Sequence, residues 1–302
     1  MTPPKVAIIV PTYNSVSDCL SCLESLMKLA YPDFAVTVVD DGSTDGTSEA
    51  VSRLYPKVRI LQGDGNLWWT GCMNVGSRDA LERGADYVMA MNSDVCVAPD
   101  CLLELVRCAE ENKPCIVGSL IYFMGDPQRI WCAGGMMVWP LVGATHIGYN
   151  ERDQGQFEGV REVEWTPGMG TLYPRKILLE LDCFDRKFPQ YYADADFSLR
   201  ARRKGYRVLV TSRSRLFNDT ETTGFLLREE GITWAEIKTV FISLRSAFDI
   251  GTYPRFVWRY SPPLLFWFCL GWHYFRLTRG ICKRLWRSIF GYRRPDALSG
   301  SC

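Results

Sequence analysis

Val38-Val39-Asp40-Asp41-Gly42-Ser43-Thr44-Asp45 is the stretch of this chain that decides the fold. The preceding run, 35–39, is rich in β-branched residues, which is typical of a buried strand. The polar block therefore begins where that strand ends, and this edge of an open parallel sheet is where ligands bind. An ordinary surface turn would also explain Asp-Gly-Ser, so this stretch alone leaves both interpretations open.

The composition indicates a globular protein with a substantial core. The chain has 302 residues, 47% of them apolar and 23% charged, with a net charge of +1. This length accommodates one large domain with an appendage or two modest domains, and the charge gives no reason to expect nucleic-acid binding. Cys19 and Cys22 are spaced as on the core face of a helix, so we expect packing rather than a metal or redox site. Met1–Lys5 leads straight into a strand, so we expect no export signal, reduced thiols and a cytoplasmic protein.

Strands and helices alternate in the first part of the chain. Strands are predicted at 6–10, 35–39, 58–61 and 87–91, and helices at 47–54, at 73–83 and from a cap at Ser17 or Asp18. This βαβαβαβ order predicts a doubly wound α/β fold with a parallel sheet flanked by helices. Polar loops follow all four strands, and the carboxyl ends of parallel strands lie at one edge, so we expect these loops to converge.

The middle of the chain, from about 115 to 175, has short β-like runs and many glycines, which predicts added strands. A tight turn is expected at 165–172. A helix is predicted at 197–204 with Gly205 after its end, followed by a strand at 206–211. His146 is interpreted as an incidental loop residue.

Five motifs occur in a characteristic order: 10–14 (Val-Pro-Thr-Tyr-Asn), 39–45, 65–71 (Gly-Asn-Leu-Trp-Trp-Thr-Gly), 92–95 (Asn-Ser-Asp-Val) and 194–197 (Asp-Ala-Asp-Phe). Over residues 5 to 225 the chain resembles the inverting family 2 glycosyltransferases of the GT-A fold. It is most similar to the bacterial rhamnosyltransferase-like branch, which builds cell-surface polysaccharides. The resemblance implies a Rossmann-like mixed sheet flanked by helices in a domain at 1–225, with a C-terminal helical extension at 226–302.

The resemblance implies a nucleotide-sugar site at the sheet edge. Pro11, Thr12 and Tyr13 would line the base pocket, and Asp41 would accept the imide N–H of uracil or thymine, with Asp40 close by. Tyr13 is equally compatible with ordinary packing at a strand end. We therefore expect a dTDP- or UDP-linked donor, dTDP-rhamnose among the candidates. The other residues assigned to this site are Asn14, Gly65, Asn66, Asn74, Asn92 and Ser93.

Asp94 matches the last, metal-binding aspartate of the family's Asp-x-Asp motif, which implies Mg²⁺ or Mn²⁺ as cofactor. Few protein ligands suffice because the donor phosphates supply the rest. Asn92 replaces the motif's first aspartate and could still bond ribose or phosphate. Many members have a histidine after the last strand; Asn218 or Asp219 occupies the matching place. A helix N-cap is the alternative role for Asp94.

Asp194 aligns with the family's catalytic base, which must take the proton of the acceptor hydroxyl. The acid that usually precedes it is replaced by Ala193. Asp196 is interpreted as a supporting residue or as the N-cap of the following helix. A second group of residues is predicted near the sugar or the acceptor, with core packing equally compatible: Trp68, Trp69, Thr70, Trp165 and Gly168.

The C-terminal part is aromatic and basic. The apolar run 262–275 is shorter than the roughly 20 residues of a spanning helix. The segment 276–289 interleaves Lys and Arg with Leu, Ile and Trp, as in a helix that lies on an anionic membrane surface. We predict a peripheral protein at the inner face of the cell membrane, with packing on the catalytic domain or an oligomer contact as alternatives. A glycan or polyprenyl-diphosphate-linked acceptor would fit this location; the oligomeric state stays open.

Three other functions fit the sequence less well than an inverting, metal-dependent transferase. A nucleotidyltransferase usually needs a Gly-rich basic phosphate loop, which 11–14 is not. A non-catalytic nucleotide-sugar-binding protein predicts loss of Asp94 or Asp194, and both are present. A processive synthase is disfavoured because the chain has no Gln-x-x-Arg-Trp box. Transfer of one or a few sugars to a hydroxyl is the preferred prediction.

Overall fold

A computed structural model describes residues 2–141, 143–219 and 233–290 of the chain. It divides into two compact units, one formed by residues 1–138 and 144–223 and the other by residues 139–143 and 224–302. Each unit is described by itself.

A central sheet organises the first unit, and its strands run in the order β10-β12-β6-β11-β4-β1-β2-β3. Two further strands extend it, since β5 pairs with β12 and β7 pairs with β6. A separate two-stranded sheet consists of β8 (Gly135–Val138) and β9 (Gly143–His146). The strands of the central sheet are β1 (Val6–Thr12), β2 (Phe34–Asp40), β3 (Arg59–Gln62), β4 (Tyr87–Ala90), β5 (Val95–Val97), β6 (Cys115–Phe123), β7 (Asp126–Cys132), β10 (Val160–Glu162), β11 (Thr171–Pro174) and β12 (Arg207–Asn218).

The strand directions confirm the predicted α/β fold with a mixed sheet. β1 runs parallel to β2 and to β4, and β2 runs parallel to β3, as the alternation of strands and helices indicated. β11 lies antiparallel between β4 and β6, which makes the sheet mixed. The parallel strands β1, β2, β3 and β4 therefore end at the same edge.

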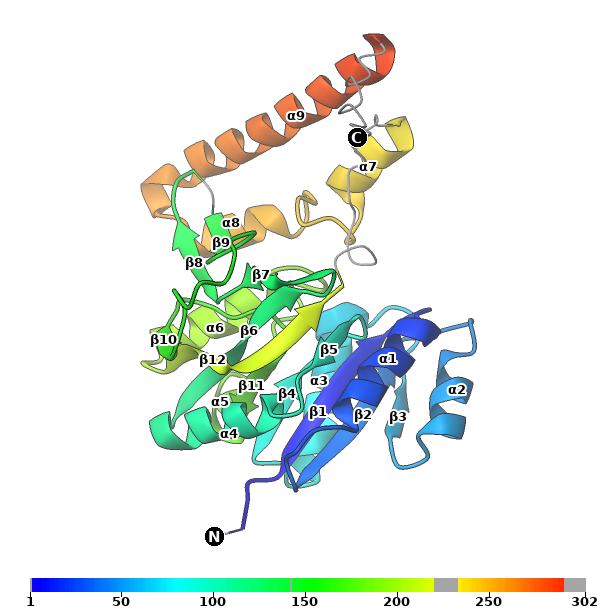
Figure 1. Ribbon diagram of the computed structural model, residues 1–302. Coiled ribbons are helices and arrows are strands. Elements are labelled where there is room, and N and C mark those ends of the chain that lie inside the picture. Colours follow the sequence, from blue (N-terminus) through cyan, green and yellow to red (C-terminus); the bar gives the residue numbers. More distant parts are fainter. Residues whose placement is uncertain (1, 142, 220–232, 291–302) are drawn as a thin grey trace, which may run out of the picture. The chain divides into compact units, whose positions relative to one another are not determined.

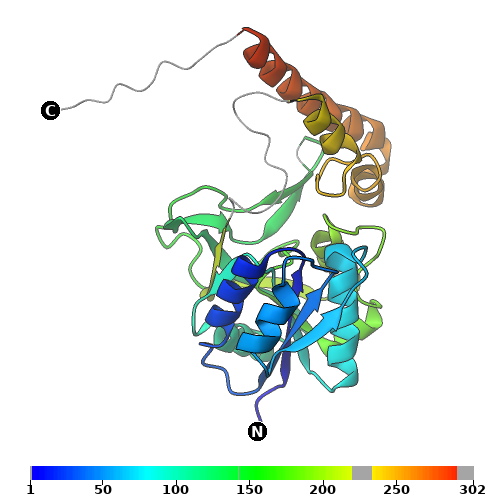
Figure 2. The same cartoon turned by 90° about the vertical axis from the view of Figure 1, so that its right-hand side faces the viewer.

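Helices cover both faces of this sheet (Figures 1 and 2). α1 (Val16–Leu26), α2 (Thr47–Leu54) and α4 (Cys101–Asn112) bury apolar side chains with Ile8 and Val38 in one core cluster. α3 (Trp68–Glu82) lies on the opposite face, where Gly76 packs against Ile9 and Val39. The alternation of side chains along β1 explains why Ile8 and Ile9 serve different layers. α5 (Arg175–Glu180) and α6 (Ala193–Arg203) follow later in the chain. Cys19 and Cys22 are buried free thiols of the α1 core, as predicted.

The sequence-based bounds are wrong at helix starts and at the last strand, since β12 runs from Arg207 to Asn218 and does not end at 211. α3 begins at Trp68 rather than at 73, and α6 begins at Ala193 rather than at 197. α1 has Ser15 as its N-cap, not Ser17 or Asp18. None of these three helices has a side-chain N-cap hydrogen bond, and left-handed residues mark two of the starts: Trp68 (φ 56°) and Tyr192 (φ 69°). The usual cap signals were therefore absent.

The second unit is helical: α7 (Trp234–Ile242), α8 (Tyr253–Tyr260), the short 3₁₀ helix η1 (Pro263–Leu265) and α9 (Phe266–Phe290). The apolar and basic segments predicted separately form one continuous helix, α9. Val240 of α7 and Ile281 of α9 are buried together in the core of the second unit. In the part of the chain that the structure describes, no helix combines the length and the apolar character needed to cross a membrane.

We predict that Gly76→Ala destabilises the first unit. A Cβ at this position would lie 2.5 Å from Ile9 Cγ2, so α3 would have to move off the sheet. Such overpacking costs about 1–3 kcal/mol, against the ~1 kcal/mol that alanine gains over glycine in a helix. Urea unfolding should show a lower midpoint than for the wild type. Gly125→Ala is the matched control, because nothing lies within 4 Å of its added Cβ; equal midpoints for the two variants would contradict the packing.

Candidate active site

The loops at the carboxyl ends of β1, β2 and β4 are tied together by short polar side chains. Asn14, in the left-handed region at φ 47°, accepts a hydrogen bond at Oδ1 from the N–H of Thr44 (2.8 Å). Its own N–H donates to Ser43 Oγ (2.9 Å). Ser15 Oγ lies 3.3 Å from Ser93 Oγ, which brings in the loop after β4. The three loops therefore meet at one edge of the sheet.

Asp41 fixes the start of α3. Its Oδ1 accepts hydrogen bonds from the N–H groups of Gly65 (2.9 Å) and Leu67 (3.2 Å), and its Oδ2 accepts one from Trp68 (2.9 Å). These groups lie at a helix N-terminus, where negative charge is stabilised. A carboxylate offers about four acceptor positions. One position therefore remains on Asp41 for the imide N–H that the resemblance implies.

The other residues assigned to the base pocket lie at the ends of β1, β2 and β3. Asp40 is buried and closes the turn after β2, where its Oδ1 accepts from the N–H of Ser43 (2.9 Å) and its Oδ2 from the hydroxyl of Ser48. Thr12, next to Pro11 at the end of β1, is paired in register with Asp40. Tyr13 is 48% exposed, so its ring is accessible for stacking. Gly65 and Asn66, in the loop that follows β3, are both exposed.

Trp69 connects this edge of the sheet to the turn before β11. Its indole Nε1–H donates to Asn92 Oδ1 (3.0 Å), and its backbone N–H donates to Gln190 Oε1 (3.1 Å). The ring lies against Gly168, where an added Cβ would be 2.3 Å from Trp69 Cζ2. Gln190 was missed by the sequence analysis, because no local pattern pairs positions 121 residues apart.

Asp194 lies in the first turn of α6, beside Gly168. Its Oδ2 accepts a hydrogen bond from the N–H of Gly168 (2.8 Å), and its Oδ1 accepts one from the N–H of Ala195 (2.8 Å). Burial raises the pKa of the Asp194 carboxyl above its usual value, and these two backbone N–H groups oppose part of that rise. Contacts thus run from Asn92 through Trp69 and Gly168 to Asp194.

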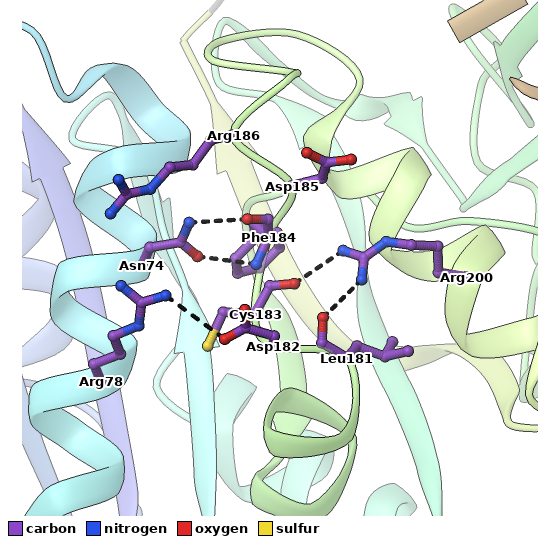
Figure 3. Close-up of a pocket in the computed structure, with 9 residues that line it drawn as sticks. All are labelled: Asn74, Arg78, Leu181, Asp182, Cys183, Phe184, Asp185, Arg186 and Arg200. Atoms are coloured by element: carbon purple, nitrogen blue, oxygen red, sulfur yellow. Dashed lines mark hydrogen bonds and ion pairs between the residues drawn. The ribbon is translucent and has the colours of Figure 1, made fainter. Parts of the chain in front are cut away.

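The loop from α5 to α6, which leads to Asp194, is held along α3. Thr70 N–H donates to Pro189 O (2.9 Å), and its hydroxyl donates to Phe188 O. One turn later, the amide of Asn74 donates to Phe184 O and accepts from Phe184 N–H, both at 2.9 Å (Figure 3). Asn74 is buried, so it holds this loop instead of making the predicted nucleotide-sugar contact. A cavity of about 400 Å³ lies here, lined by Asn74, Arg78, Leu181, Asp182, Cys183, Phe184, Asp185, Arg186 and Arg200.

Asp196 also has a different role from the predicted one. It is fully buried and forms an ion pair with Arg200 (2.8 Å), one turn further along α6. Arg200 donates in addition to Leu181 O and Cys183 O, both at 2.9 Å (Figure 3). The pair therefore fixes the beginning of the α5–α6 loop. It is neither an N-cap nor an acceptor contact.

Asp94, Asn218 and Asp219 come together where β5 meets β12. Asn218 is paired with Val95 in register, and the N–H of Asp219 donates to Asp94 O (3.1 Å). Asn218 is buried, and among the described residues its Oδ1 has no hydrogen-bond partner. Asp18 of α1, predicted only as a possible helix cap, lies close enough that burial and then the charge of Asp219 raise its pKa. No group of three His, Cys, Asp or Glu side chains in the described ranges could hold a metal ion by itself.

Trp165 and His146 belong to a packed aromatic cluster. Trp165 is buried, and its ring centroid lies 5.2 Å from that of His146. His146 also lies 4.5 Å from Trp131 between ring centroids, and burial lowers its pKa to about 4. The interpretation of His146 as an incidental loop residue is therefore wrong: it is the last residue of β9 and part of this packing.

Comparison with known proteins shows the family of this chain. The family model "Glycosyl transferase family 2" matches residues 7–178. The chain belongs to glycosyl transferase family 2. It is 31% identical to the undecaprenyl-phosphate mannosyltransferase of Micrococcus luteus over 198 residues, 63% of this chain and 67% of that protein. It is 27% identical over 239 residues to the N-acetylglucosaminyl-diphospho-decaprenol L-rhamnosyltransferase of Mycobacterium tuberculosis, 72% of this chain and 77% of that protein.

Solved structures agree on the fold of this glycosyltransferase. A mannosyltransferase from Pyrobaculum calidifontis in complex with GDP-Man and Mn²⁺ has a TM-score of 0.55 at 20% identity, covering 74% of this chain and 59% of that one. GalNAc-T7 with UDP, GalNAc and Mn²⁺ has a TM-score of 0.60 at 13% identity, covering 72% and 44%. The resemblance to family 2, its rhamnosyltransferase-like members and the GT-A fold is confirmed.

We predict that Gly168→Ala impairs this glycosyltransferase through Asp194. The added Cβ would collide with the Trp69 ring and displace the N–H that donates to Asp194. A misplacement of this kind can lower turnover about 10²-fold. Because that N–H lowers the pKa of Asp194, its loss should raise this pKa and move the acid limb of the kcat–pH profile to higher pH. Gly125→Ala is the control, and an unmoved acid limb in Gly168→Ala would contradict the link.

Proposed function

We propose that this glycosyltransferase moves a sugar, with inversion, from a dTDP- or UDP-linked donor to a hydroxyl of a lipid-linked or polysaccharide acceptor in cell-surface glycan synthesis. The observation that carries the proposal is the carboxylate of Asp194, held by Gly168 and linked through Trp69 to the donor edge. The two curated relatives, named as transferases to undecaprenyl phosphate and to a decaprenol-linked sugar, support a lipid-linked acceptor. dTDP-rhamnose is one candidate donor.

Asp194 acts as the general base in this proposal. In an inverting transfer the acceptor oxygen attacks the anomeric carbon while the nucleoside diphosphate leaves from the opposite side. Asp194 takes the hydroxyl proton, so it must be ionised when the acceptor arrives. Its raised pKa brings its proton affinity closer to that of a working base. Because a protonated carboxyl cannot take that proton, activity is lost as the pH falls through the pKa of Asp194.

Asp41 and Tyr13 bind the base of the donor. The remaining acceptor position of Asp41 would take an imide N–H, which uracil and thymine have and cytosine lacks. The Tyr13 ring, which is accessible, would stack on the base. The carboxylate of Asp41 that would bind the nucleobase is already oriented by three backbone N–H groups.

A divalent cation, Mg²⁺ or Mn²⁺, fits the residues around Asp94. Asp94, Asn218 and Asp219 offer hard oxygen ligands, and the buried Asn218 Oδ1 lacks a partner among the described residues. Two carboxylates and an amide suffice where donor phosphates complete the coordination. When bound, the cation supplies charge stabilisation to the departing diphosphate. The neighbouring structures solved with Mn²⁺ support this cofactor.

We further propose that the protein acts in the cytoplasm as a peripheral protein at the inner face of the cell membrane. A polyprenyl-linked acceptor is held in that membrane, and the exposed aromatic and basic side chains of the second unit support a location there. A catalytic domain at 1–225 and a helical region at 226–302 are the corresponding functional division.

The donor is tested by thermal unfolding with a panel of sugar nucleotides. A dTDP- or UDP-sugar should raise the melting temperature more than the CDP- or GDP-linked sugars, and Mg²⁺ or Mn²⁺ should enlarge the shift. At a donor concentration of about 100 times Kd, binding adds about 2.7 kcal/mol to stability. A shift that does not depend on metal would contradict the proposed divalent cofactor. A preference for GDP-sugars would contradict the proposed recognition of uracil or thymine by Asp41.

Asp194→Asn separates binding from chemistry. The amide keeps the size of the carboxylate but cannot take a proton, so turnover should fall by about 10²–10⁴-fold. The donor-induced shift in melting temperature should stay as in the wild type. Asp33→Asn, at an exposed position before β2, is the matched control. Wild-type turnover in Asp194→Asn would show that another group is the base.

A further inference from the structure

Large apolar side chains are exposed along one side of α8, η1 and α9. The exposed fractions are 99% for Leu264, 79% for Trp267 and 72% for Trp258. Contiguous exposed apolar side chains on a soluble protein mark interaction sites more often than isolated ones do. We call the following set the aromatic face: Trp258, Leu264, Trp267, Phe268, Trp272 and Phe275.

The aromatic face is continuous from α8 into α9. Phe268 and Trp272 are stacked at 6.4 Å between ring centroids, and Trp272 lies 6.0 Å from Phe275. Phe266 joins α8 to this row, because its ring centroid lies 5.0 Å from Trp258 and 4.8 Å from Trp267. The spacing 268, 272, 275 places these rings on one side of a helix.

The other side of α9 already has its partner within the second unit. Cys269 and Ile281 are buried, and Ile281 packs with Val240 of α7. A surface helix of a globular protein normally has one apolar stripe and a polar opposite face. α9 has a second apolar side that the described residues of its own unit leave exposed, so this side is suited to an external occupant.

The charges next to the aromatic face select the occupant. Arg276, Arg279 and Lys283 are exposed on the turns of α9 that follow the rings. The chain has no acidic residue from 250 to 295. A second copy of the chain docked through this face would bring two basic helices together without an acid between them, which is unfavourable. An anionic lipid surface offers the complementary charge, and Trp prefers the boundary between water and hydrocarbon.

We propose that the aromatic face docks on an anionic phospholipid surface with α9 lying in the plane of the membrane. Leu264 and the rings enter the acyl boundary, while Arg279 and Lys283 stay at the headgroups. This docking rests on the proposed function, because a lipid-linked acceptor is what would place the enzyme at a bilayer.

Vesicle binding of the full chain tests the proposal. Phosphatidylcholine vesicles with phosphatidylglycerol should sediment the protein, and phosphatidylcholine alone should bind it weakly. The double variant Leu264→Ser with Trp267→Ser should lose about tenfold or more in partitioning, because two side chains leave the acyl boundary. Leu54→Ser with Leu179→Ser, which changes two exposed residues of the first unit, is the matched control and should bind as the wild type does. Arg279→Gln with Lys283→Gln should lose the preference for anionic vesicles.

Two results would overturn the docking. One is unchanged binding of the Leu264→Ser, Trp267→Ser variant. The other is a wild-type protein that binds neither kind of vesicle and forms a dimer that the Trp267→Ser substitution dissociates. This outcome would assign the aromatic face to contact with a second copy of the chain. The donor-induced melting shift is measured on every variant and should be unchanged. A lost shift in the wild type would count against the proposed function, whereas lost vesicle binding with an intact shift counts against the docking alone.

Discussion

The hydrogen bonds from the start of α3 to Asp41 are the constraint on which the site depends. Three backbone N–H groups, of Gly65, Leu67 and Trp68, converge on one carboxylate. A helix N-terminus leaves such groups unsatisfied, and a buried acid satisfies them with charge-assisted bonds. Since no residue side chain caps α3 in the usual way, Asp41 takes over that task from the neighbouring strand. The carboxylate of Asp41 therefore sets the angle at which α3 leaves the sheet edge. The family resemblance assigns this same carboxylate to binding of the donor's nucleobase.

α3 then carries this constraint to the other half of the site. Trp69 reaches Asn92 on one side and Gly168 on the other, while Thr70 and Asn74 hold the α5–α6 loop that ends at Asp194. Two carboxylates that belong to different parts of the sequence thus depend on one rigid helix. Gly76 allows that helix to approach Ile9 and Val39 closely. The position of Asp194 is consequently coupled to the packing of α3 on the sheet.

The sequence predicted the parallel strands β1, β2, β3 and β4, the meeting of the loops that follow them and the set of motifs there, because these follow from local patterns and from the family resemblance. It failed where a residue's partner lies far along the chain. Asn74 and Asp196 look like site residues in sequence, yet both are buried, and they bond to Phe184 and Arg200. The starts of α3 and α6 were missed because left-handed Trp68 and Tyr192 give no recognised cap signal. Which side of α9 packs inward was equally invisible, since both sides are apolar.

Asn92 illustrates how a departure from the family pattern can be accommodated. An aspartate at this position would bring a second charge to the cation; here Asn92 Oδ1 instead accepts the indole N–H of Trp69. In the proposed site, that bond would leave the Nδ2 group of Asn92 to donate toward ribose or phosphate, the opposite polarity to a metal ligand. Charge for the proposed cation would then come from Asp94, Asp219 and the donor phosphates. An enzyme built this way would gain its cation together with its donor, so we expect the cation to bind weakly in the absence of the sugar nucleotide.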